Sequence, residues 1–163
     1  MESEKYGWLD IRNNQNYKYA DLVETTHNLN SSIQALINKY HQDFNKKINL
    51  IGFSQGSIVC LTLALEFPDA FEKIALLSGF LPEDPPLLRS DSHQHQSFYI
   101  AHGTLDKMVE FKNAKITYDY LSSLGAKVHL CQEEVGHKIG AKCILNLKRF
   151  FQSSTSLEKR EQS

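Results

Sequence analysis

The segment GFSQG at residues 52–56 places one serine between two glycines, in the pattern G-x-S-x-G. A dense apolar run precedes the pattern and a second apolar stretch follows it, so the serine stands where a buried strand should turn into a helix. In such a tight turn, a side chain at Gly52 or Gly56 would collide with a neighbouring strand or helix. The Ser54 hydroxyl would face a helix N-terminus, which favours the negative charge of acyl transfer. The pattern predicts a nucleophilic serine, and a capping serine in a glycine-containing loop is the alternative.

A serine hydroxyl is a weak nucleophile at neutral pH, so this chemistry requires a histidine to accept its proton and an acid to orient that histidine. Both residue types follow in the required order, Asp106 in HGTLDKMV and His137 in EEVGHKIG, each just after a predicted strand. The carboxyl ends of parallel strands lie along one edge of a sheet. We therefore predict that Ser54, Asp106 and His137 converge there.

Other polar residues are weaker candidates for these roles. Asp84 follows the second predicted strand and could serve as the acid, whereas Glu133 and Glu134 are second choices beside the predicted base. His93 and His95 form an H-x-H pair in a polar loop, but a third ligand is not apparent, so we predict no metal site.

The elements that must position these residues alternate between helical periods and short aliphatic runs, which is typical of an α/β fold with a parallel sheet. The predicted helices are 21–41, 55–67, 110–124 and 139–151, and the predicted strands are 48–53, 73–80, 98–103 and 127–133. Gly125 is the predicted C-cap of the third helix. A chain of 163 residues encloses one ordinary core, so we expect a single domain over residues 1–152 and a disordered tail over 153–163.

Composition and charge narrow the classes of partner. Apolar residues make up 41% of the chain and the formal net charge is −1, with no stripe of lysine or arginine, which argues against nucleic-acid binding. No run of eighteen apolar residues or secretion signal is present, so we expect a cytoplasmic protein without a membrane span. Cys60, Cys131 and Cys143 lie far apart without CxxC spacing, so we expect neither a disulfide framework nor a zinc site, in agreement with a reducing compartment.

Five motifs together resemble a known family, the phospholipase/carboxylesterase branch of the α/β-hydrolases, which includes the acyl-protein thioesterases. They are W-x-D-I at 8–11, GFSQGS at 52–57, SGFLP at 78–82, HGTLD at 102–106 and GH at 136–137. The resemblance implies a three-layer α/β-hydrolase sandwich with a mostly parallel sheet. It implies that Ser54, Asp106 and His137 are nucleophile, acid and base, and that the backbone N–H of Gln55 serves the oxyanion hole. The implied reaction is hydrolysis of small acyl esters or thioesters, without a metal or an organic cofactor.

The chain also departs from this family. Ser57 stands where the family usually has glycine, and members carry several strands before W-x-D-I, with an L-H-G type loop that supplies a second oxyanion N–H. The resemblance therefore implies an N-terminally truncated fold and a serine hydrolase of low activity. The alternative is a weak or inactive fragment, or a binding subunit, that needs the missing segment for its oxyanion hole. We also expect self-association through residues 48–53, because an apolar strand at an open edge presents unpaired backbone groups.

Overall fold

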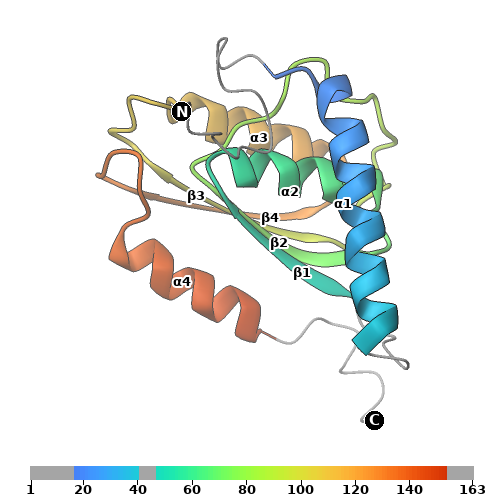
Figure 1. The fold of residues 1–163 in the computed structure, drawn as a ribbon. Helices are drawn as coiled ribbons and strands as arrows, with labels where there is room; N and C mark the ends of the chain where they lie inside the picture. Colours follow the sequence, from blue (N-terminus) through green and yellow to red (C-terminus); the bar gives the residue numbers. More distant parts are fainter. Residues whose placement is uncertain (1–16, 41–46, 154–163) are drawn as a thin grey trace, which may run out of the picture.

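The computed structural model describes residues 17–40 and 47–153 (Figure 1). The elements are α1 (Tyr19–Tyr40), β1 (Ile48–Phe53), α2 (Gln55–Glu66), β2 (Phe71–Leu77), β3 (Ser97–Gly103), α3 (Lys112–Ser123), β4 (Lys127–Glu133) and α4 (Ala141–Gln152). The predicted order of helices and strands is confirmed, with ends that shift by up to three residues. The W-x-D-I motif at residues 8–11 and all of the predicted tail except Ser153 lie outside the described residues.

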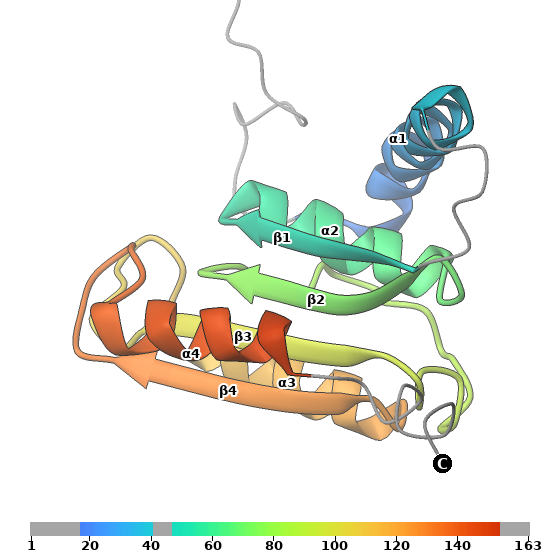
Figure 2. The same cartoon turned by 90° about the horizontal axis from the view of Figure 1, so that it is seen from below.

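The four strands lie side by side in the order β1-β2-β3-β4, and every neighbouring pair is parallel. Helices α2 and α3 cover one face of the sheet, α4 covers the other, and α1 packs against α2 (Figures 1 and 2). The described residues therefore form the three layers of the predicted α/β fold. Because all strands run in the same direction, the loops after their carboxyl ends share one edge of the sheet.

The hydrophobic core lies on both faces of the two central strands. In β2, Ile74 and Leu76 pack into the cluster under α1, α2 and α3, whereas Ala75 and Leu77 pack into the cluster under α4. Successive side chains of a strand point to opposite faces, so a strand between two helical layers has to be apolar almost throughout. This requirement explains the uninterrupted run of apolar residues in β2.

Gly125 ends α3 in the way the sequence predicts. Its φ is +79°, in the left-handed region that favours glycine. The N–H groups of Gly125 and Ala126 donate to the carbonyl oxygens of Ser122 and Leu121, at 3.0 and 3.3 Å. These bonds satisfy carbonyl groups of the last helical turn and direct the chain into β4.

A buried lysine of β2 secures the end of α4. The ammonium group of Lys73 donates to the carbonyl oxygens of Phe150 and Phe151, at 3.2 and 3.4 Å, and also to that of Ser153. The last carbonyl groups of a helix lack partners within the helix and carry partial negative charge, so a cation is favourable there. Lys73 thereby fixes the C-terminal end of α4 to the sheet.

A disulfide joins β4 to α4, contrary to the sequence prediction. Cys131 and Cys143 are bonded, with Cα atoms 5.7 Å apart, while Cys60 is a buried free thiol whose pKa burial raises to about 11. The prediction was wrong because it judged the cysteines by their spacing along the chain. Helix α4 folds back over β4, so residues twelve apart in sequence become neighbours in space.

The outer strand β1 carries exposed apolar side chains. Ile51 and Phe53 of β1 are 58% and 45% exposed, and β1 pairs only with β2 within the described part of the chain. The predicted edge position of residues 48–53 is thus present among these residues. No helix of the described segments combines the length and the apolar character needed to cross a lipid bilayer.

Candidate active site

Ser54 occupies a strained turn between β1 and α2. Its φ of 52° and ψ of −118° lie where non-glycine residues are rare, so the surrounding structure has to hold this conformation. The Ser54 N–H donates to the carbonyl oxygen of Leu77 at 2.8 Å, which ties the turn to the end of β2. Gln55 follows as the first residue of α2, so the Ser54 side chain lies at a helix N-terminus.

The two glycines that flank the serine have different surroundings. A Cβ atom added at Gly52 would lie 2.2 Å from the carbonyl oxygen of Gly56 and 2.6 Å from the backbone nitrogen of Ser57. At Gly56, an added Cβ would meet nothing within 4 Å among the described residues. The prediction that both positions exclude a side chain is therefore wrong at Gly56, which lies on an open side of the first turn of α2.

The Ser57 side chain meets a third glycine instead. Ser57 is buried, and a Cβ at Gly79 would lie 2.3 Å from its hydroxyl oxygen. The serine that departs from the family pattern thus fills space that Gly79 leaves open. The start of α2 therefore packs closely against the loop after β2.

His137 lies between Ser54 and Asp106. Its Nε2 atom is 3.0 Å from the Ser54 hydroxyl oxygen, and its Nδ1 atom is 2.7 Å from Oδ2 of Asp106. The Asp106 carboxyl is fully buried and the imidazole is 15% exposed. A carboxylate that accepts a hydrogen bond from Nδ1–H leaves Nε2 unprotonated toward the serine. The structure therefore brings together the three residues singled out in the sequence, from three different loops at the carboxyl edge of the sheet.

The surroundings of Asp106 favour its ionised form. Burial by itself would raise the pKa of this carboxyl, but hydrogen bonds from the Val109 N–H, the His137 ring and the Met108 N–H together bring the pKa below its ordinary value. The two backbone donors lie 3.0 and 2.9 Å from Oδ1. Backbone N–H groups of the loop of residues 104–111, which we call the acid loop, thus donate to Oδ1. Oδ2 remains to accept the hydrogen bond that orients the imidazole.

His102 supports the acid loop from inside the core. Its side chain is fully buried, its Nε2 donates to the carbonyl oxygen of Val109 at 2.8 Å, and the same nitrogen lies 3.4 Å from Oδ2 of Asp106. The bond to Val109 closes the loop around Asp106. We assign His102 a structural role because of these contacts.

Glu133 holds the loop that carries His137. Its Oε2 accepts the N–H of Cys143 at 2.7 Å and its Oε1 accepts the N–H of Lys142 at 3.2 Å, so the carboxylate takes two N–H groups of the first turn of α4. Gly140, at the N-cap of this helix, offers no side chain for that purpose. The carbonyl oxygen of Glu133 also accepts the N–H of Thr104 at 2.8 Å, which joins the acid loop to the His137 loop.

Sequence reasoning missed this function of Glu133 and treated the residue only as a second-choice acid. The one signal in the sequence was a predicted helix that begins at Ile139 with no Ser, Thr, Asp or Asn just before it as a cap. Such a gap indicates that a capping group comes from elsewhere, but it does not say from which residue.

The other candidates lie apart from this arrangement. Asp84 and Glu134 are exposed, and the partner of His137 is Asp106. His93 is buried beside the Ser92 hydroxyl, and burial lowers its pKa, while His95 donates to the carbonyl oxygen of Pro68 at 2.8 Å. Among residues 17–40 and 47–153, no three His, Cys, Asp or Glu side chains group in a way that could hold a metal ion.

Exposed apolar side chains belong to the same loops as the three polar residues. The Phe53 ring lies 5.1 Å from the His137 ring, between centroids. Leu105 and Met108 flank Asp106 in sequence and are 56% and 59% exposed. The site thus combines a hydrogen-bonded polar chain with exposed apolar surface.

Curated relatives of this chain are acyl-protein thioesterases. The chain is 29% identical over 126 residues to acyl-protein thioesterase 1 of Debaryomyces hansenii, with 74% of this chain and 54% of the relative covered. It is 25% identical over 163 residues to the protein of the same name from Eremothecium gossypii, with 93% and 67% covered. The chain thus spans between about half and two thirds of the length of these relatives.

Solved structures show the same fold. The carboxylesterase from Mesorhizobium loti superposes with a TM-score of 0.80 at 16% identity, over 94% of this chain and 72% of that one. The Bacillus cereus carboxylesterase superposes with a TM-score of 0.73 at 23% identity, over 82% and 61%. The sequence pattern of the phospholipase/carboxylesterase family matches residues 1–155. The chain therefore belongs to the phospholipase/carboxylesterase family.

Proposed function

We propose that this chain is a serine hydrolase that cleaves carboxylic esters or thioesters, with Ser54 as nucleophile, His137 as base and Asp106 as the orienting acid. The observation that carries the proposal is the continuous hydrogen-bonded chain from the Ser54 hydroxyl through the imidazole to a buried carboxylate. Family membership supports the same reaction class, because the relatives are named thioesterases and carboxylesterases.

The geometry suggests two acyl-transfer steps. Nε2 of His137 takes the hydroxyl proton while the Ser54 oxygen attacks the acyl carbonyl carbon, and the imidazolium then gives this proton to the departing alcohol or thiol. A water molecule, deprotonated by the same nitrogen, attacks the acyl-serine and releases the carboxylic acid. Asp106 stabilises the imidazolium in both steps because its carboxylate is held ionised beside Nδ1.

The negative charge on the attacked oxygen needs hydrogen-bond donors. The backbone N–H of Gln55, the first residue of α2, is our candidate for one of them, since N–H groups at a helix N-terminus point away from the helix toward the end where Ser54 lies. For the acyl group itself, Phe53 at the end of β1 and Leu105 and Met108 near Asp106 supply apolar surface. We therefore propose substrates with an aliphatic acyl chain.

The exposed edge of β1 suggests contact with a second copy of the chain. Among the described residues, β1 pairs only with β2, and it carries the exposed side chains of Ile51 and Phe53. An apolar edge strand favours pairing with another strand. We propose self-association through residues 48–53. Sedimentation as a monomer at all concentrations, together with slow amide exchange along β1, would contradict this part of the proposal.

The test of the hydrolase proposal uses p-nitrophenyl butyrate and a fluorophosphonate that labels active serines. Ser54→Ala should lose both hydrolysis and labelling, and His137→Ala should lose on the order of 10³-fold or more of the rate, since the hydroxyl then keeps its proton. Ser57→Ala is the matched control, because it removes the hydroxyl three residues further along the same turn. Labelling of Ser54→Ala at the parent level would show that another residue is the nucleophile.

A further inference from the structure

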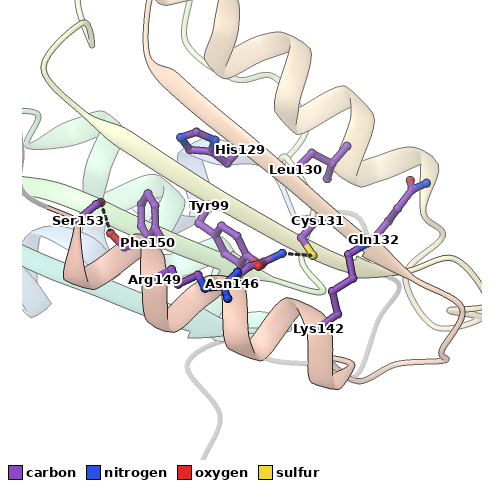
Figure 3. Close-up of a pocket in the computed structure, with 10 residues that line it drawn as sticks. All are labelled: Tyr99, His129, Leu130, Cys131, Gln132, Lys142, Asn146, Arg149, Phe150 and Ser153. Atoms are coloured by element: carbon purple, nitrogen blue, oxygen red, sulfur yellow. Dashed lines mark hydrogen bonds between the residues drawn. The ribbon is translucent and has the colours of Figure 1, made fainter.

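A cavity separate from the Ser54 site lies between β4 and α4 (Figure 3). Its volume is about 680 Å³, and its lining residues are Tyr99, His129, Leu130, Cys131, Gln132, Lys142, Asn146, Arg149, Phe150 and Ser153. None of the three proposed catalytic residues is among them. The cavity therefore needs an explanation other than acyl binding.

Cys131 lines this cavity, and its sulfur contacts another lining residue. Cys131 is one of the lining residues, and its sulfur lies 3.8 Å from the side-chain nitrogen of Asn146, which donates to it (Figure 3). Both cysteines are buried, but Cys131 is 7% exposed, whereas Cys143 is 1% exposed and is not a lining residue. A reagent in the cavity would therefore meet the disulfide from the Cys131 side.

The lining residues carry basic side chains and no acidic ones. Lys142, Asn146 and Arg149 are spaced at four and three residues along α4, so they project from one face of the helix, and all three line the cavity. The lining includes no aspartate or glutamate. Two cations in the lining would attract a small anion and raise its local concentration in the cavity that Cys131 lines.

We propose that this cavity binds a small thiol that carries carboxylate groups, and that this thiol exchanges with the Cys131–Cys143 disulfide. The thiolate attacks the Cys131 sulfur, a mixed disulfide forms there, and the bond to Cys143 breaks, so that Cys143 departs as a thiolate and takes a proton from water. A second molecule of the thiol attacks the mixed disulfide and frees Cys131. The protein disulfide is reduced by two electrons, and two thiols are oxidised to one disulfide.

The exchange would act on the loop of residues 134–140, which the disulfide brackets. Reduction removes the covalent tie between β4 and α4 and leaves non-covalent ties, among them the bonds of Glu133 to the backbone of Lys142 and Cys143. We expect His137 to be held less firmly in the reduced protein. This consequence rests on the proposed hydrolase function, whereas binding and exchange at the cavity do not.

The first experiment compares three small thiols of similar size and different charge on the oxidised parent protein. Samples with 3-mercaptopropionate, 2-mercaptoethanol or cysteamine are quenched with acid, alkylated and weighed by mass spectrometry. Each rate is divided by the rate of the same thiol with a small neutral disulfide, which cancels differences in thiolate fraction and intrinsic nucleophilicity. The anionic thiol should react about tenfold faster than the neutral one, and the cationic thiol should be slowest, with differences that shrink in salt. Equal rates for the three, or a fastest cysteamine, would overturn the proposal, as would a parent protein that forms no disulfide in air.

The second experiment assigns the selectivity to the lining cations. The double variant Lys142→Gln/Arg149→Gln should lose the preference for 3-mercaptopropionate, whereas Lys148→Gln, an exposed lysine of the same helix outside the cavity, should keep it. Circular dichroism checks that the variants fold. An unchanged preference in the double variant would show that the cavity does not select the thiol.

The third experiment asks which sulfur reacts. Oxidised 3-mercaptopropionate should modify Cys131 in Cys143→Ser faster than it modifies Cys143 in Cys131→Ser, because only Cys131 lines the cavity. A faster reaction at Cys143 would contradict the proposed direction of attack. Repeating the thiol series with Ser54→Ala separates the thiol-exchange proposal from the hydrolase proposal. This variant lacks the candidate nucleophile, so exchange at the parent rate would show that the exchange does not depend on Ser54.

Discussion

The Ser54 side and the His137 side of the site are built in different ways. Ser54 sits in a strained backbone turn at the start of α2, a helix whose residues from Ser57 to Leu65 are all buried. His137 lies in a loop before α4, a helix in which only Cys143 and Phe150 are buried. Ser54 is thus positioned by main-chain packing within the core, whereas His137 is positioned by side-chain ties near the surface.

This difference shows how one site can be sensitive to two kinds of change. Close packing leaves no room for added volume at Gly52, so the serine side should respond mainly to steric changes. The carboxylate of Glu133 and the Cys131–Cys143 disulfide hold the histidine side, which should respond mainly to charge and redox changes. The following predictions test this comparison, beginning with the largest expected effect.

Gly52→Ala should be the most damaging substitution. The added methyl group would overlap backbone atoms of Gly56 and Ser57, which cannot move without displacing the start of α2. We expect a loss of about 3 kcal/mol in the free energy of unfolding, measured by urea denaturation, and loss of hydrolysis. A variant within 1 kcal/mol of the parent would show that the turn is less tightly packed than the structure indicates.

Glu133→Gln should weaken the histidine side without unfolding the protein. The amide keeps one acceptor oxygen and turns a donor toward a backbone N–H of α4, so we expect a loss of about 1 to 3 kcal/mol in stability. Hydrolysis should fall about tenfold through kcat, because the loop of His137 is held less firmly. Glu134→Gln, at an exposed neighbouring position, is the control and should behave as the parent does. Equal kinetics for the two variants would remove Glu133 from the comparison.

The buried Asp106 carboxylate should make the stability depend on acid. Its folded pKa lies below the ordinary value of about 3.9, so the ionised form stabilises the fold fully above that pH. This contribution is lost as the pH falls through the lower pKa of the folded state. Denaturant unfolding of the parent and of Asp106→Asn between pH 2 and pH 7 should show the parent losing more stability below about pH 4. Parallel curves for the two proteins would contradict the assigned direction of the shift.

Gly56→Ala should have the smallest effect and the opposite sign. The position is helical and open, so alanine should raise the free energy of unfolding by about 0.5 to 1 kcal/mol through a better helix propensity. Hydrolysis should be unchanged. Paired with Gly52→Ala, this variant separates steric exclusion at one position from a general requirement for glycine in the motif. A destabilised Gly56→Ala would instead support the expectation from the sequence that a side chain at Gly56 collides with a neighbouring element.

Periodicity and motif spacing determined much of this protein from the sequence alone. The order of helices and strands, the parallel sheet and the cap at Gly125 follow from patterns within short segments. The candidate residues Ser54, Asp106 and His137 were chosen by their positions after predicted strands, and their catalytic roles are proposals that the variants above test. Local patterns suffice here because strand direction alone decides which loops share an edge.

Only the tertiary structure decided the contacts that depend on how elements pack. Helix α4 folds back over β4, and this arrangement pairs Cys131 with Cys143 and directs the Glu133 carboxylate to the first turn of the helix. The open side of Gly56 likewise depends on which segments surround α2 in space. Such contacts join residues whose spacing along the chain carries no periodic signal, because their distance is set by the packing of the whole fold.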